Sequence, residues 1–392
     1  MIISSCDLVT YHAIVIGEVI KILLKKLIKT RDYMKSTKCL CNLLLLCMII
    51  ASLQAPRSIH RPYDPCMPEI TTFWTDDNSN PTKKKTYSLR SYYLSEWAIF
   101  GRYDKELLEK NQLPAQISYH YEPNKSVNAE KLNALIEDFI QELSTATKKR
   151  AQFKNFIILK DRNFNYKMNA GLIIVKFNDY PFVLKLFIEK PATFTKPFAK
   201  GFETGVFFIM GDGITRYLAG FTRIPNLLSI QQKITADPYW SQHIVLPRKW
   251  YWTPRNNRTF TVTGKNIGTN PEQSIEFPSI YAVICDEIQI ERQLHTYHKR
   301  DRAIVKEIVQ FLGNRIDPHV YNFFIEKGTG KTAIIDTEHI ASMIGLHEPI
   351  EFHNNTQWYC SLAKKCTYDA LFRTKKYRRD IQKRPLSENL KI

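Results

Sequence analysis

Three polar side chains near the C-terminal end of the chain, Asp317, Asn322 and Asp336, are of types that can act on a phosphate group. A carboxylate can accept the proton of an attacking hydroxyl group. An amide oxygen and a second carboxylate are hard ligands of the kind that hold Mg²⁺ on a nucleoside triphosphate. The pattern therefore makes Asp317 the candidate catalytic residue, and Asn322 and Asp336 the candidate metal ligands.

Each of these residues also has a purely structural interpretation. Asp317 precedes Pro318, a position where aspartate often caps a turn, and Asn322 can equally be a turn residue. Asp336 follows two isoleucines, and a carboxylate at the end of a buried strand needs either a partner or a metal ion. The order of helix, loop, hairpin and aspartate carries more information than any one residue.

Gly-Thr-Gly-Lys-Thr at residues 328–332 is similar to a phosphate-binding loop, but the match is incomplete. That motif needs another glycine five positions before Gly330, where Ile325 stands. It also needs a following helix, whereas residues 332–335 continue as a strand. The pattern therefore predicts a hairpin turn.

The elements that would position these residues follow from the apolar periodicity. Asn128 is a good N-cap for a helix over residues 128–144, whose apolar side chains share one face. Short β-type runs at 156–159, 171–175 and 182–188 predict an antiparallel meander. Residues 56–125 are expected to be irregular. Further elements are expected as strands at 243–252, 259–263, 280–285, 321–326 and 332–335, and as helices toward 227–234, at 301–312 before Gly313, and near 358–372.

In its motifs and their order, the chain resembles the protein-kinase-like superfamily over about residues 153–345, and its aminoglycoside-phosphotransferase-like branch most closely. Members of that branch often carry Asp-x-His-x-x-Asn in the catalytic loop, and this chain has Asp317, His319 and Asn322. They often carry Ile-Asp-x-Glu as the metal motif, and this chain has Asp336 and Glu338 at those positions.

The resemblance implies further site residues and two cofactors, ATP and Mg²⁺. Lys185, in an apolar strand, would be the third-strand lysine that engages the phosphates; the alternative is an edge lysine that points to solvent. Asp286 ends the strand that would run into the adenine-binding hinge. Glu203 is our choice as the ion-pair partner of Lys185, and Glu189 is an alternative. Lys185 and Asp336 should then converge on one cleft with the 317–322 loop.

The chain also departs from the family pattern. The segment that should be a glycine-rich phosphate loop, residues 160–169, contains no glycine, although Lys160, Arg162 and Lys167 supply positive charge there. The usual lead-in before Asp317 is missing, and too few residues follow Asp336 for a full substrate lobe. These departures favour an alternative in which the fold binds a ligand without catalysis.

The composition, 44% apolar and 24% charged, is that of a folded domain and excludes a disordered or collagen-like chain. The net charge of +18 attracts anions without choosing among them. Three tryptophans near Arg248 and Lys249 suggest stacking on nucleic-acid bases, but a core strand with a solvated edge explains them better. The cysteines form no C-x-x-C pair, which argues against a zinc site.

The N-terminal region predicts export. Lys35 and Lys38 precede an apolar core at residues 43–50 and then small residues, which is the order of a signal peptide. A membrane anchor or a buried helix is the alternative for residues 34–55. Residues 1–33 suit an amphipathic leader or a misassigned start. The expected location is secreted, periplasmic or membrane-anchored through the 34–55 segment.

These inferences combine into an α+β, reduced two-lobed protein-kinase-like fold behind an export signal. The expected parts are an extension with one helix at 56–150, an antiparallel N-lobe sheet at 151–290, and a small helical C-lobe with a basic tail at 291–392. The leading functional hypothesis is Mg-ATP-dependent phosphoryl transfer to an unidentified hydroxyl acceptor, a small molecule or a protein. A catalytically inactive kinase-like binding module is the alternative. A basic surface that binds anionic partners, without specific nucleic-acid recognition, is the third.

Overall fold

The structure is a computed structural model, which describes residues 69–75, 85–88, 103–148, 152–194, 214–265, 272–295, 297–313 and 315–339. The chain divides into two compact units, Met1–Pro65 and Cys66–Ile392, and all described residues belong to the second. That unit is α+β with mostly antiparallel sheets. The expected leader, export segment, 358–372 helix and basic tail lie outside the described residues. Within the described ranges, no helix combines the length and apolar character needed to cross a membrane.

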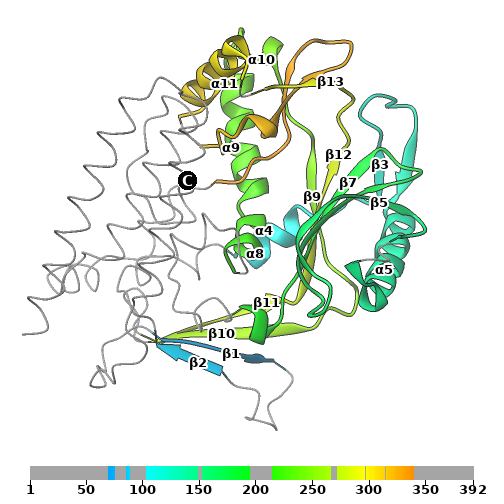
Figure 1. The fold of residues 1–392 in the computed structure, drawn as a ribbon, viewed down its shortest axis with the longest axis vertical. Helices are drawn as coiled ribbons and strands as arrows, with labels where there is room; N and C mark the ends of the chain where they lie inside the picture. The colour runs from blue at the N-terminus through cyan, green and yellow to red at the C-terminus, as the bar shows by residue number, and fades with distance from the viewer. Residues whose placement is uncertain are drawn as a thin grey trace, which may run out of the picture. The chain divides into compact units, whose positions relative to one another are not determined.

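A five-stranded antiparallel sheet occupies the centre of the unit (Figure 1). Its spatial order is β5-β6-β7-β12-β9, and the consecutive pairing of β5, β6 and β7 confirms the predicted meander. The strands are β5 Phe156–Asn165, β6 Ala170–Phe177, β7 Phe182–Ile188, β9 Lys249–Trp252 and β12 Ile280–Asp286. Most of their side chains are buried, because helices cover both faces of the sheet.

One face of this sheet packs against helix α5, Ala129–Thr145, as Figure 1 shows. The Asn128 side chain accepts the Glu130 N–H at 2.7 Å and caps the helix, as the sequence predicts. The opposite face packs against helices α8, Ile214–Gly220, and α9, Arg223–Thr235. This second face carries the candidate site.

The region expected to be irregular, residues 56–125, contains regular elements, so that expectation is wrong over the described part. Its elements are β1 Glu69–Trp74, β2 Lys85–Ser88, helix α4 Lys105–Lys110 and β3 Gln116–Ser118, which pairs with β4 Ser126–Asn128. Strand β1 pairs with β10, Thr259–Lys265, in a sheet of order β11-β10-β1-β2, where β11 is Glu272–Pro278. This pairing joins segments far apart in the sequence, and no local sequence pattern predicts it.

A third sheet, of order β13-β14-β15-β8, leads to Asp336. It contains β8 Ile244–Val245, β13 Ile290–Gln293, β14 Phe323–Glu326 and β15 Thr332–Ile334. The turn between β14 and β15 holds Gly328 and Gly330 at φ +85° and +67°, which confirms the predicted hairpin in place of a phosphate loop. Helix α11, Lys299–Phe311, precedes this hairpin and ends before Gly313, which has φ +66°. The short helix α10 is Trp240–His243, and a 3₁₀ turn covers Val320–Asn322.

Strand β5 continues through the segment where a glycine-rich loop was expected. It is bulged, with register shifts on either side of Lys160, and the turn into β6 is confined to residues 166–169. The bulge brings the Asn163 carbonyl so close to Gly171 that a Cβ there would lie 2.3 Å from the oxygen. Gly171 is therefore required by the close approach of the two paired strands, and not by a phosphate that contacts its backbone.

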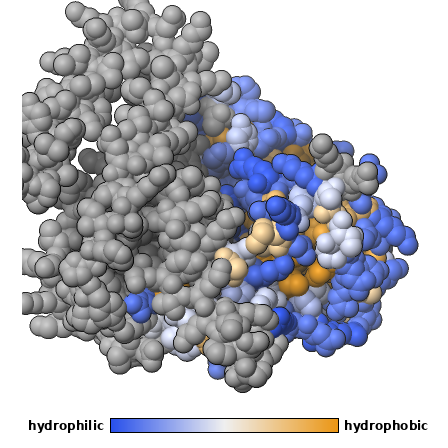
Figure 2. Space-filling model, turned by 60° about the horizontal axis from the view of Figure 1, so that its bottom comes forward, coloured by the Kyte–Doolittle hydropathy of each residue, from blue (hydrophilic) through white to orange (hydrophobic). Residues whose placement is uncertain are grey.

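The face seen in Figure 2 is mostly hydrophilic over the described residues, with smaller apolar areas between the polar ones. Three of the exposed large apolar side chains are Ile157 and Leu159 of β5 and Tyr297 before α11. Single exposed apolar side chains are ordinary in folded domains and indicate no binding site by themselves.

Candidate functional site

The site centres on an ion pair between two residues that the sequence predicts to converge. Lys185 Nζ of β7 lies 3.1 Å from Asp336 Oδ2, just beyond β15. The Lys185 residue is only 6% exposed, so it is not the solvated edge lysine of the alternative interpretation. The structure thus joins the central sheet to the end of the third sheet through these two side chains.

A buried arginine that the sequence reasoning missed completes this cluster. Arg223, at the start of α9, lies with its Nε 2.9 Å from Asp336 Oδ1 and its Nη2 2.8 Å from Glu338 Oε2. Burial would raise the pKa of Asp336, but Arg223 and the nearby lysines outweigh it and hold that pKa well below its usual range. Burial, together with the Asp336 and Asp317 carboxylates, raises the pKa of Glu338 despite Arg223.

The loop that carries Asp317 and Asn322 lies beside this cluster. The Asn322 Nδ2 donates to the Asp317 carbonyl oxygen at 3.4 Å, and the Ile335 N–H donates to the Asn322 carbonyl oxygen at 3.0 Å. The Asp317 Oδ1 accepts the His319 N–H at 3.0 Å, which is the turn-capping role of the structural interpretation. Capping does not exclude chemistry, because a carboxylate has further lone pairs to accept a proton.

Glu203 and Asp286 are the other two residues predicted to bind the cofactor. Glu203 lies outside the described residues. The Asp286 carboxylate is buried and accepts two hydrogen bonds from the Arg248 guanidinium, at 2.7 Å from Nε and 2.9 Å from Nη2. The Asp286 N–H donates to the Arg248 carbonyl oxygen at 3.1 Å. This side chain therefore ties β12 to the segment before β9, and its part in nucleotide binding stays a prediction.

Lys249 is a second missed residue, and the expectation of a solvated edge is wrong for it. It is 5% exposed, and its Nζ donates to Thr337 Oγ1 at 2.7 Å. Lys249 is opposite Cys285, and Val283 two positions earlier is opposite Lys185, so the two lysines share the face toward α9. The sequence did contain a signal for this. Side chains alternate along a strand, so Lys249 shares the face of Tyr251, which is buried.

The environment of Lys249 disfavours its charged form. Burial lowers its pKa to about 7; Lys185 and Arg223 act in the same direction, whereas Asp336 and Cys285 oppose them. Because the unfolded chain binds the proton more tightly, the stability of the protein should rise between about pH 7 and the ordinary lysine pKa of 10.5.

Replacing Lys249 by methionine should raise the free energy of unfolding near pH 7, since methionine keeps the volume and removes the buried amine. The difference in free energy of unfolding between the variant and wild type should decrease by up to about 1.4 kcal/mol per unit of pH as the pH rises from 7 to 9. Urea unfolding of both proteins at pH 7, 8 and 9 measures this. Parallel pH profiles would show that Lys249 remains charged in the folded state.

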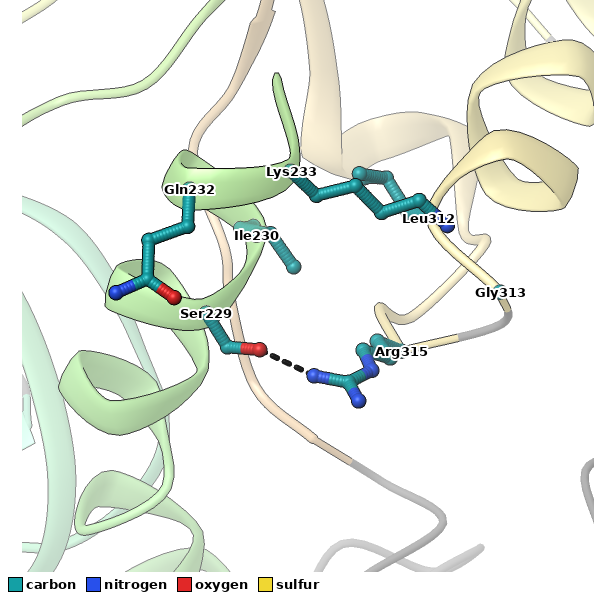
Figure 3. Close-up of a pocket in the computed structure, with 7 residues that line it drawn as sticks. All are labelled: Ser229, Ile230, Gln232, Lys233, Leu312, Gly313 and Arg315. Carbon is teal, nitrogen blue, oxygen red and sulfur yellow. Dashed lines mark hydrogen bonds between the residues drawn. The ribbon is translucent and has the colours of Figure 1, made fainter. Parts of the chain in front are cut away.

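A separate cavity of about 420 Å³ lies between α9 and the end of α11 (Figure 3). Its lining consists of Ser229, Ile230, Gln232, Lys233, Leu312, Gly313 and Arg315. The Arg315 guanidinium donates to Ser229 Oγ, and the Lys233 Nζ lies 5.1 Å from the centre of the Phe311 ring. Arg315 thus bonds to another lining residue, Lys233 lies over an aromatic ring of α11, and none of the predicted site residues lines the cavity.

Comparison with known proteins finds no match among protein families, curated proteins or solved structures. The Lys185–Asp336 cluster and the loop beside it are therefore the features of this chain that bear on its function.

Proposed function

We propose that the protein is a kinase-like phosphotransferase that uses Mg-ATP on a hydroxyl acceptor. The observation that carries this proposal is the 3.1 Å contact of Lys185 with Asp336 beside the loop of Asp317 and Asn322. The four residues match in type the phosphate lysine, the acid-base aspartate and the asparagine and aspartate metal ligands of kinase-type phosphoryl transfer.

The order of elements supports a kinase-like fold. Counted along the chain, Lys185 lies on the third strand of the central sheet and Asp286 ends the fifth. Helices α8 and α9 come between its third and fourth strands, and Asp336 follows the β14–β15 hairpin. In protein kinases the phosphate lysine also lies on the third strand, and the metal aspartate comes after the catalytic loop.

The donor atoms at the site fit Mg²⁺. Asp336 offers carboxylate oxygens, and Asn322, whose Nδ2 is used on the Asp317 carbonyl, has its amide oxygen for a ligand. Mg²⁺ prefers such hard oxygen ligands, with phosphate oxygens and water completing its shell. When bound, it would neutralise charge on the phosphates. In this proposal Lys185 binds phosphate oxygens, and Asp317 orients the acceptor hydroxyl and takes its proton.

A catalytically inactive binding module is the second candidate, and a specific contact favours it. Arg223 already pairs with Asp336 and Glu338, so a metal ion must compete with a buried guanidinium for its ligand. The strand at the position of the phosphate loop also lacks glycine. Both features are compatible with a protein that binds a nucleotide and transfers nothing.

Thermal unfolding of the full chain with ATP, with and without Mg²⁺, tests the proposal together with a phosphate-transfer assay. A ligand present at 100 times its Kd stabilises the folded state by about 2.7 kcal/mol, which is measurable as a rise in Tm. We expect Mg-ATP to raise Tm and γ-phosphate to be transferred to a hydroxyl acceptor. A rise in Tm without transfer would support the binding module, and no rise at millimolar Mg-ATP would reject both.

A further inference from the structure

Several cationic side chains gather around Asp336. Three of the cations are at least nine-tenths buried, namely Lys185, Arg223 and Lys249. The carboxylates that act within this group include Asp317, Asp336 and Glu338. Three more cations, Lys160, Arg162 and Arg216, act on the same groups.

The sheet register places Lys160 on the wall of this cluster. Lys160 is opposite Ile174 on β6, and Ile174 is opposite Lys185 on β7, so the three residues form one row across the face toward α9. The bulge in β5 falls at Lys160, between its two register shifts. A bulge re-aims the side chains beside it, so alternation from Lys160 does not fix the face of Arg162, whose side chain is exposed.

The electrostatics agree with this placement. Burial lowers the pKa of Lys160, with Arg162, Arg216 and Lys185 acting in the same direction and Asp336 opposing them. Lys160 and Arg162 also lower the pKa of His319, in the loop that begins at Asp317, although burial is the larger cause. Lys160 therefore acts on both Lys185 and the loop that begins at Asp317, and Arg162 acts on Lys160 and on that loop.

In the part of the chain that the structure describes, an unpaired hydrogen-bond donor lies at the centre of the cluster. The Arg223 Nη1 is buried and has no hydrogen-bond partner among the described residues. A buried cation that lacks a full set of acceptors is costly, and an anionic ligand would supply them.

We propose that Lys160 and Arg162 on the bulged strand β5, with Arg216 of α8, bind the phosphate chain of the nucleotide through their side chains, in place of the backbone amides of a glycine-rich loop. This inference rests on the proposed function and adds the mode of phosphate recognition. A phosphate chain is the anion that fits best, because it offers many acceptor oxygens and several charges to a group of lysines and arginines. It would lie between β5 and the 317–322 loop, next to Lys185.

The test measures binding of ATP, adenosine and inorganic tripolyphosphate to the full chain by calorimetry. Lys160→Gln and Arg162→Gln should each weaken ATP and tripolyphosphate binding about tenfold, and together about a hundredfold. Arg216→Gln should weaken both about tenfold. Adenosine binding should be unchanged in every variant. Lys167→Gln is the matched control, because Lys167 is exposed on the turn of the same hairpin and outside the cluster.

Each outcome decides the inference separately from the phosphotransferase proposal. Equal losses in Lys167→Gln and in the cluster variants would overturn it, because they would show general attraction to a basic surface. Unchanged ATP binding in the Lys160→Gln/Arg162→Gln variant, with wild-type transfer intact, would overturn it and leave the proposed function standing. Loss of polyphosphate affinity in that variant, in a protein that transfers no phosphate, would support it and reject catalysis. A wild-type protein that binds neither anion would overturn it outright.

Discussion

Replacing Asp336 by asparagine should lower the free energy of unfolding by about 3 kcal/mol, because it leaves Arg223 and Lys185 buried without their shared carboxylate. The amide keeps the shape of the side chain and one acceptor oxygen, so the loss comes mainly from charge. Urea unfolding at pH 7 measures it. If the two proteins were equally stable, the buried ion pairs would contribute nothing net to the fold.

Glu338→Gln is the matched control for this change. Glu338 contacts the same Arg223, but its pKa is raised, and its removal leaves Arg223 paired with Asp336. The cost should therefore be about 1 kcal/mol, near that of one hydrogen bond. A cost equal to that of Asp336→Asn would show that the two carboxylates share the charge of Arg223 equally.

The pH dependence gives a second check on Asp336. Its pKa in the folded protein lies well below the ordinary value of 3.8, so its contribution to stability is complete above that value. The contribution is lost as the pH falls from about 4 toward the lower folded pKa. The gap in stability between wild type and Asp336→Asn should therefore narrow as the pH falls below about 4.

The same variant tests the metal assignment. If Asp336 holds Mg²⁺, Asp336→Asn should abolish the Mg²⁺-dependent part of the ATP-induced rise in Tm, with each protein compared with its own unliganded form. The part that ATP produces without Mg²⁺ should persist, since Lys185 is retained. A Mg²⁺-dependent rise in Tm of wild-type size in the variant would show that Asp336 does not bind the metal ion.

The elements that the sequence predicted correctly are those that depend on local patterns. The helix after Asn128, the β5–β6–β7 meander and the hairpin around Gly328 and Gly330 each depend on neighbours within a few residues. The resemblance to kinase-like proteins implied that Lys185 and Asp336 would converge, and the structure places the two side chains in contact. The kinase-like fold itself remains a proposal.

What the sequence did not reveal depends on long-range pairing. Strand β1 exists because β10 lies beside it, and a run of six residues carries too weak a pattern to show this. Arg223 gave no signal of its own, since a lone arginine near a helix start is usually exposed. The bulge at Lys160 is visible only in the register of two strands.

Replacing Asp317 by asparagine should reduce phosphate transfer by about 10²- to 10⁴-fold while leaving Mg-ATP binding nearly intact. Asparagine can still accept the His319 N–H, so the turn should survive, but an amide cannot take the acceptor's proton. Single-turnover transfer assays measure the rate, and the ATP-induced rise in Tm measures binding.

The chain supplies a matched control in Asp237, which also precedes a proline and caps a turn through its Oδ1, with the Tyr239 N–H at 2.9 Å. Asp237→Asn makes the same chemical change in the same local structure, away from the cluster. It should leave transfer at the wild-type rate. If both variants lost transfer equally, the effect would belong to the turn and not to proton transfer. If neither did, Asp317 would be a turn residue only, and catalysis would need another base.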